Sequence, residues 1–178
     1  MRCIARLSED DAAVPFYAVL VPLFEREGEI YVLLTQRSSK LRAHGGEVAC
    51  PGGRRDVSDA AEAFMRGLTT DAWTALRESQ EEIRLPHSHV QLVCELERLV
   101  HPSSGGAYSM ITPVVGVIDA GFAELTHALK PNDEVSHAFT VPLEMFLSDV
   151  PGYTVVDRVH DAYTFRNHSW NYPPDAPI

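Results

Sequence analysis

Apolar and polar positions follow two periods along the chain, one typical of strands and one typical of helices. Residues 16–24, FYAVLVPLF, form a nearly continuous apolar run, which predicts a buried β-strand. Residues 25–29 contain a glycine and predict a turn, and residues 30–35 predict the returning strand of a hairpin. The same reasoning predicts strands over residues 47–50, 90–100, 110–118 and 135–141, and a last hairpin from the segments YTVV and DAYTF.

Helical periodicity runs from residue 59 to residue 85. It is interrupted at residues 67–70, where a glycine and two threonines lower the helix propensity. Asp71 is expected to cap the second helix, and Pro86 is expected to end it. Residues 142–147 predict a further short helix. Strands mixed with helices in this way predict an α/β fold.

The second helix presents an unusual acidic face. Glu78, Glu81 and Glu82 stand at i, i+3 and i+4, so their carboxylates share one side of the helix, where like charges repel. Trp73 and Leu76 belong to an opposite, mostly apolar side that can be buried. Most glutamate-rich helix faces are simply solvated. The alternative is a site for a hard cation such as Mg²⁺ or Mn²⁺, which prefers oxygen ligands.

A glycine turn and a basic segment precede this helix. Gly52 and Gly53 permit a close approach of the backbone to a ligand, which side chains would obstruct. Upstream, Arg37 and Arg42 belong to a local basic zone in an acidic chain. The planar fork of arginine suits phosphate oxygens, so these residues are candidates for substrate binding. Ordinary solubilising loop charges are the alternative, and composition does not choose between the two.

Composition limits the function classes. A chain of 178 residues with 45% apolar and 22% charged residues suits one globular domain over residues 16–178, preceded by a tail over residues 1–15. The net charge of −10 argues against a nucleic-acid partner. No apolar run is long enough to span a membrane. The three cysteines lack metal or redox spacing, which indicates a reducing compartment.

Together these segments resemble the Nudix hydrolase superfamily. Its box reads Gx5Ex7REUxEExGU, where U is a bulky apolar residue; here Gly53 opens the box and Asp59 takes the first acidic position. Arg77, the three glutamates and Leu85 match its second half. Residues 33–59 are similar to the extended motif of the coenzyme A pyrophosphatase branch, and the resemblance covers about residues 16–147. It implies a Nudix fold, an α/β/α sandwich with a mixed β-sheet.

The chain departs from the family pattern at several positions. Seventeen residues separate Asp59 from Arg77, where the general box has seven, so about residues 60–70 are interpreted as an insertion. Arg84 replaces the box glycine, and Ser79 replaces an apolar residue. The sequence also stops before the family's C-terminal helix. Either the chain is truncated, or this protein covers that face of the sheet by other means, such as a partner subunit, and a homodimer is retained as an expectation.

The resemblance implies a reaction and roles for the matching residues. The reaction is metal-dependent hydrolysis of the diphosphate of coenzyme A or acyl-CoA, giving 4′-phosphopantetheine and adenosine 3′,5′-bisphosphate. Glu78, Glu81 and Glu82 are expected to hold Mg²⁺ or Mn²⁺, and Arg77 to orient these carboxylates. Either Glu81 or Glu134 could be the catalytic base. Arg37, Arg42, Gly52 and Gly53 are expected to bind substrate.

Two alternatives stay open at this point. The first is a Nudix hydrolase for another nucleoside diphosphate derivative, such as ADP-ribose or a dinucleotide. The second is a catalytically inactive Nudix-like binding module, suggested by the expanded box and by Arg84. The expected partner is a small molecule, with no nucleic acid and no membrane. The expected location is intracellular, cytoplasmic by default, and the resemblance also allows a peroxisome or mitochondrion.

Overall fold

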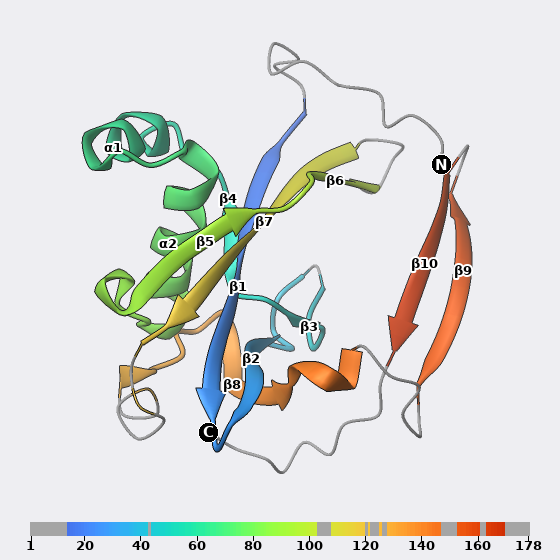
Figure 1. Ribbon diagram of the computed structural model, residues 1–178. Helices are drawn as coiled ribbons and strands as arrows, with labels where there is room; N and C mark the ends of the chain where they lie inside the picture. Colours follow the sequence, from blue (N-terminus) through green and yellow to red (C-terminus); the bar gives the residue numbers. More distant parts are fainter. Residues whose placement is uncertain are drawn as a thin grey trace.

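The computed structural model describes residues 14–42, 44–102, 108–119, 121, 125, 128–146, 153–160 and 163–169. Its centre is an eight-stranded sheet with the main order β3-β2-β1-β7-β5, to which β4, β6 and β8 add on β1, β7 and β2 (Figure 1). The strands are β1 (Phe16–Arg26), β2 (Glu29–Arg37), β3 (Val48–Ala49), β4 (Gly52–Arg54), β5 (Val90–Glu95), β6 (Leu99–Pro102), β7 (Tyr108–Ile118) and β8 (Val135–Pro142).

The sheet is mixed, as predicted. β1 pairs in parallel with β7, from Phe16 opposite Met110 to Leu23 opposite Val117. Every other pairing in the sheet is antiparallel, including the predicted β1–β2 hairpin. A parallel pair needs a long crossover, and the helices lie in that connection between β1 and β7.

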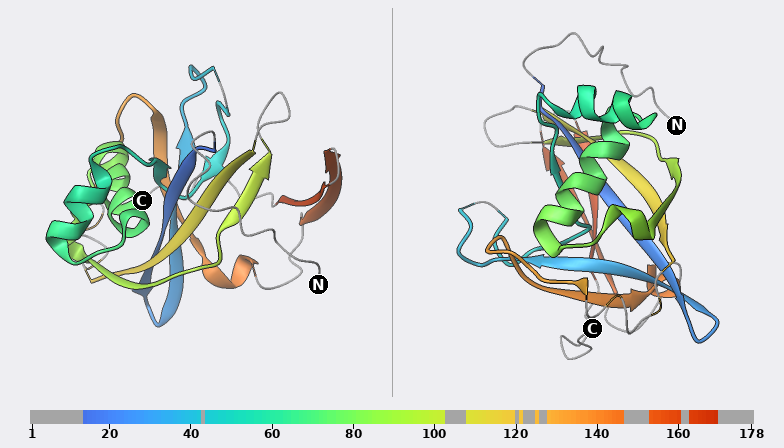
Figure 2. Two further views of the ribbon diagram at one scale, coloured as in Figure 1. Left: turned by 90° about the horizontal axis from the view of Figure 1, so that it is seen from above. Right: turned by 90° about the vertical axis from the view of Figure 1, so that its left-hand side faces the viewer.

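Alternation along the strands gives the sheet two apolar faces. Ala18, Leu20 and Phe24 of β1 are buried in the main core with the apolar side of α2 (Thr70–Ile83). A smaller cluster around Val32, Leu34 and Val141 lies on the other face, where η2 (Leu143–Phe146) packs. Both described α-helices lie on the same side of the sheet (Figure 2). The predicted α/β fold with a mixed sheet is confirmed in the described residues; of the expected α/β/α sandwich, they show both α-helices on one face and the short 3-10 helix η2 on the other.

The helical region has the predicted interruption but different caps. α1 (Asp59–Arg66) ends at Gly67, which has a left-handed φ of 67°. α2 is capped by Thr69, whose side chain accepts a hydrogen bond from the Ala72 amide, so the prediction of Asp71 as the cap is wrong. The chain enters the helix two residues earlier than expected because a threonine hydroxyl also satisfies a free helix amide. α2 ends at Ile83, before Pro86, because Arg84 adopts a left-handed φ of 62°.

Other elements follow the sequence with small shifts. The strand expected over residues 90–100 is two strands, β5 and β6, and both pair with β7. η1 (His87–His89) connects α2 to β5. β9 (Thr154–His160) and β10 (Tyr163–Ser169) form the predicted last hairpin as a separate two-stranded sheet. The described residues exclude, among others, residues 1–13 of the predicted tail, residues 103–107, and the chain after residue 169. Among the described helices, none is long and apolar enough to cross a membrane.

Candidate active site

Helix α2 brings its acidic face against the glycine turn. The turn becomes strand β4, which pairs with β1 through Gly52 opposite Val19 and Gly53 opposite Ala18. β1 is central in the sheet, so β4 holds the turn on a rigid scaffold beside α2. Two glutamates of α2, Glu78 and Glu82, contact this turn from the C-terminal half of the helix.

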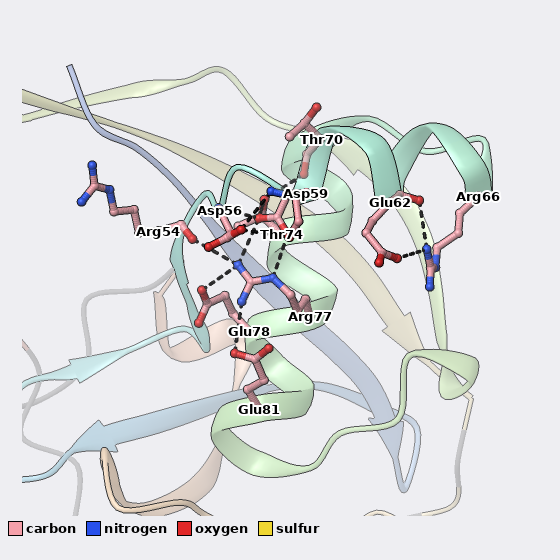
Figure 3. A network of polar contacts seen from close by, with 11 residues as sticks. Arg54, Asp56, Asp59, Glu62, Arg66, Thr70, Thr74, Arg77, Glu78 and Glu81 are labelled. Atoms are coloured by element: carbon pink, nitrogen blue, oxygen red, sulfur yellow. Dashed lines mark hydrogen bonds and ion pairs between the residues drawn. The ribbon is translucent and has the colours of Figure 1, made fainter. Parts of the chain in front are cut away.

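Arg77 is the centre of a polar network on this face (Figure 3). Its Nε donates to Oδ1 of Asp59 at 2.8 Å, and its Nη2 donates to Oδ2 of the same carboxylate at 3.0 Å. Nη2 also lies 2.9 Å from Oε1 of Glu78, and Nη1 lies 3.1 Å from Oε2 of Glu81. A further bond, at 3.2 Å, runs from Nη2 to the Arg54 carbonyl of β4. One guanidinium therefore fixes two glutamates of the acidic face and the adjacent strand.

Asp59 anchors this guanidinium from the start of α1. Its side chain is fully buried and also accepts hydrogen bonds from the Thr74 hydroxyl at 2.7 Å and the Asp56 amide at 2.8 Å. Burial acts to raise the pKa of Asp59, but these hydrogen bonds and the Arg77 charge outweigh burial and lower it. The carboxylate is therefore ionised at neutral pH and holds Arg77 in one orientation.

Glu82 lies deepest among the three glutamates. Its side chain is 7% exposed, and Oε2 accepts a hydrogen bond from the Gly52 amide at 3.0 Å. The guanidinium of Arg37, on β2, lies 3.8 Å from Oε1. Burial, with the nearby charges of Glu78 and Glu134, raises the pKa of Glu82 to about 7. A neighbouring cation would stabilise the ionised form of such a buried carboxylate and would offset the cost of its burial.

Glu78 lies against Gly53 at close range. A Cβ atom at Gly53 would lie 2.5 Å from Oε2 of Glu78, so only glycine leaves room for this carboxylate. Burial raises the pKa of Glu78 above its usual value, and Arg77 opposes this shift. Two neighbouring acids with raised pKa values indicate a site that favours a cation.

Comparisons with known proteins agree with this arrangement. The chain is 39% identical over 150 residues to the peroxisomal coenzyme A diphosphatase NUDT7 of Mus musculus, covering 80% of this chain and 56% of that protein. It is 39% identical over 149 residues to the mitochondrial Nudix hydrolase 15 of Arabidopsis thaliana, covering 82% of this chain and 47% of that protein. No family model matches. The chain belongs to the Nudix hydrolase superfamily.

Solved structures show the Nudix fold. A binary complex of the Ap4A hydrolase of C. elegans superposes with a TM-score of 0.57 at 19% identity, covering 74% of this chain and 82% of that one. A Nudix hydrolase from Alicyclobacillus acidocaldarius gives 0.56 at 20% identity, covering 75% and 81%. The chain spans about half the length of the curated relatives named above, 56% and 47%.

The Nudix residues expected from the sequence are only partly brought together. Glu78, Glu82 and Arg77 converge with the glycine turn, whereas the Glu81 side chain is 57% exposed and, among the described residues, pairs only with Arg77. Arg37 faces Glu82, and its buried Nε atom has no hydrogen-bond partner among the described residues. Arg42 is exposed and makes no ion pair with the described residues.

Glu134 lies just before β8, whose first residue, Val135, is opposite Arg37 of β2. It is exposed, its carbonyl accepts a hydrogen bond from the Ser38 amide at 2.7 Å, and its charge contributes to the raised pKa of Glu82. The acid outside the box is therefore close enough to influence the Nudix glutamates.

Asp71 is a third buried carboxylate, after Asp59 and Glu82, and the sequence does not predict that it supports the site. Asp71 is 3% exposed and accepts hydrogen bonds from Arg55, Arg98 and Thr112 at 2.5, 3.0 and 2.7 Å. These partners come from the end of the glycine turn, from the β5–β6 connection and from β7. Asp71 therefore ties the first turn of α2 to the sheet. The sequence signal was an acid in the first helical turn, which a cap explains equally well.

Nudix hydrolases generally need divalent cations, and the donor chemistry of this site fits one. Glu78 and Glu82 offer oxygen ligands beside a turn with no side chains, and burial raises the pKa of both. Among the described residues, no three acidic, histidine or cysteine side chains already converge on one point. Arg77 draws Glu78 and Glu81 toward itself, so a bound cation would compete with this guanidinium for the two carboxylates.

Proposed function

We propose that this protein hydrolyses the diphosphate bond of coenzyme A or an acyl-CoA, with Mg²⁺ or Mn²⁺. The extended motif over residues 33–59 and the likeness to a coenzyme A diphosphatase support this substrate class. The observation that carries the chemistry is the contact of two glutamates with the glycine turn. Glu82 accepts a hydrogen bond from the Gly52 amide, and the Glu78 carboxylate occupies the space that a side chain at position 53 would fill.

Each residue of the site has a role in this proposal. Glu78, Glu81 and Glu82 would hold the divalent cation, which when bound neutralises diphosphate charge and lowers the pKa of a water. Arg77 fixes the orientation of Glu78 and Glu81 and is itself fixed by Asp59. The glycine turn keeps side chains away from the diphosphate.

Phosphate binding is assigned to Arg37 together with the turn. The unpartnered buried Nε of Arg37 lies in a side chain whose Nη1 faces Glu82, so the guanidinium has donors left for a phosphate oxygen. Arg42, exposed on the neighbouring loop, is assigned a weaker, solvent-screened contact with the substrate's outer phosphate. Either Glu81 or Glu134 takes the proton from the attacking water, because both are exposed carboxylates: Glu81 is on the acidic face, and Glu134 is close enough to contribute to the raised pKa of Glu82.

The experiment is hydrolysis of coenzyme A by the full chain with Mg²⁺ or Mn²⁺, with products separated chromatographically. ADP-ribose and diadenosine compounds are run in parallel. We expect phosphopantetheine and adenosine bisphosphate, and we expect the rate to fall by at least about 100-fold in Glu82→Gln. The matched control is Glu62→Gln, because Glu62 is an exposed acid of α1 that pairs only with Arg66.

The outcomes separate the alternatives. Turnover of ADP-ribose or a dinucleotide without turnover of coenzyme A would replace the proposed substrate, but it would support diphosphate hydrolysis at this site. Calorimetric binding of Mn²⁺ that Glu82→Gln abolishes, with no hydrolysis of any substrate, would favour an inactive binding module. Equal rates in Glu82→Gln and wild type would refute the assignment of the acidic face.

A further inference from the structure

Helix α1 exposes an apolar face that the proposed chemistry does not use. The Phe64 and Met65 side chains are 84% and 81% exposed, and Val57, just before the helix, is 98% exposed. The next most exposed large apolar residue among those described is Val93, at 60%. Ala60 and Ala61 extend the exposed stripe. α1 lies at the outer edge of the molecule, away from the sheet (Figure 2). A concentrated apolar patch of this kind marks an interaction site.

A groove lies beside the same helix, where α1, α2 and β5 meet. Its volume is about 440 Å³, and its walls include Leu68, Trp73, Leu76 and Leu92. Arg66 covers the Trp73 ring at 3.9 Å, and the His87 ring lies 5.8 Å from it, so both line the groove with polar groups. A cavity of roughly 150 Å³ already accepts a benzene ring. The groove is therefore large enough for a phenylalanine side chain with a neighbouring residue.

The protrusion and the groove lie on opposite flanks of α1. Successive residues of an α-helix are rotated by about 100°, so Phe64 and Arg66 are separated by about 200° around the helix axis. Arg66 borders the groove, and Phe64 therefore projects from the other flank. Met65 lies between them, opposite the buried Ala63.

We propose that a second copy of this chain covers this surface. A two-fold axis roughly parallel to α1 exchanges the two flanks of the helix. Phe64 of each copy then enters the groove of the other, and the two Met65 side chains meet between the helices. Such an isologous interface needs a protrusion and a matching recess on one chain, and this surface supplies both.

Area and charge are consistent with a modest dimer. Each aromatic side chain buries roughly 150–250 Å², so two Phe64 contacts remove on the order of 300–500 Å², and Met65, Val57 and the groove walls add to this area. Specific interfaces begin at about 1,000 Å². The charged residues on α1 beside the patch, Glu62 and Arg66, form an ion pair with each other. Two copies can therefore meet here with little repulsion despite the net charge of −10.

Sedimentation velocity of the full chain under reducing conditions tests the proposal. Wild type is expected to be a dimer that dissociates on dilution, over about 1 to 100 µM for an interface this small. Phe64→Ser is expected to raise the dissociation constant roughly 30-fold or more, as for an aromatic hot spot. The control is Ile30→Ser, because Ile30 is an apolar residue, 46% exposed, on β2, a strand that pairs with β1 and β8 and lies away from α1 (Figure 1). A monomeric wild type, or an unchanged dimer in Phe64→Ser, overturns the proposal.

A mixing experiment distinguishes this interface from any other. Leu92→Lys blocks the groove but keeps Phe64, whereas Phe64→Ser keeps the groove but lacks the protruding ring. Each variant alone is expected to be monomeric. Mixed together, they retain one complete contact and are expected to form a heterodimer. Leu68→Lys replaces Leu92→Lys if thermal melting shows that the edge strand is disturbed. The absence of a heterodimer from two folded variants contradicts the reciprocal arrangement.

Discussion

The Nε atom of Arg77 lies 2.8 Å from Oδ1 of Asp59, which is eighteen positions earlier in the chain. Helix α1 lies in the segment between these two residues. Asp59 and Arg77 are nevertheless in contact, because Asp59 is held at the start of α1 and α1 packs on α2. α1 lies at the outer edge of the molecule (Figure 2), and the acidic face of α2 lies against the glycine turn.

Replacing this arginine tests whether its fork orients the glutamates. Arg77→Lys keeps the charge but loses the paired hydrogen bonds to Asp59 and the simultaneous contacts with Glu78 and Glu81. We expect the rate of diphosphate hydrolysis to fall by about 10–100-fold with little change in KM. Steady-state kinetics measure this, and Arg66→Lys is the control. Equal kinetics in Arg77→Lys and wild type would show that charge alone suffices.

The raised pKa of Glu82 gives a pH dependence of stability. The folded-state pKa is about 7 and the ordinary value is 4.5, so the folded state binds more protons than the unfolded state between these values. The free energy of unfolding of the metal-free protein should therefore fall as pH rises from about 4.5 to 7, by up to roughly 3 kcal/mol. Urea unfolding in the presence of a chelator measures this. Glu82→Gln should remove most of the decrease, and an identical pH profile in that variant would contradict the assignment.

The two glycines of the turn should fail in different ways. At Gly53 a Cβ would meet the Glu78 carboxyl, which can rotate away, so Gly53→Ala should lose most activity while its melting temperature changes little. At Gly52 a Cβ would lie 2.5 Å from the Val19 Cα in the central strand, which cannot move. Gly52→Ala should cost about 3 kcal/mol or more of unfolding free energy. Thermal melting and kinetics on both variants separate the two effects. If both variants melted at the wild-type temperature, the backbone at Gly52 would be able to shift away from a Cβ, as the Glu78 side chain is expected to do at Gly53.

Asp71 should matter for stability although it lies away from the acidic face. Asp71→Ala leaves Arg55 and Arg98 without their shared partner and Thr112 without its acceptor. The loss should be about 3 kcal/mol, at the lower end for a buried pair, because the two arginine side chains are 23% and 29% exposed. Chemical denaturation measures it, with Asp119→Ala, an exposed acid, as the control. A change below about 0.5 kcal/mol would mean that water replaces the carboxylate.

The sequence predicted the parts of this molecule that depend on local patterns. A nearly continuous apolar run followed by a glycine-containing turn located the β1–β2 hairpin, and glycine with two threonines located the break between the helices. The spacing of the three glutamates predicted a shared face, but it did not reveal that Glu82 is buried while Glu81 is largely exposed. That difference depends on where β4 packs, and this is a long-range contact. The partners of Asp71 come from three distant segments and carry no local signal.

The last prediction concerns a residue where the sequence departs from the family pattern. Arg84 stands where the Nudix box has glycine, and its φ of 62° is left-handed. This conformation costs a residue with a Cβ roughly 1–2 kcal/mol relative to glycine. Arg84→Gly should therefore raise the unfolding free energy by about 1 kcal/mol, after the larger entropy of glycine in the unfolded chain is included. Urea unfolding measures the gain in unfolding free energy. An unchanged m-value would show that the surface exposed on unfolding is the same in the variant and in wild type. Arg84→Ala is the matched control, because alanine removes the charge but keeps the Cβ. Equal stabilisation by alanine and glycine would assign the gain to loss of the charge instead of relief of the backbone.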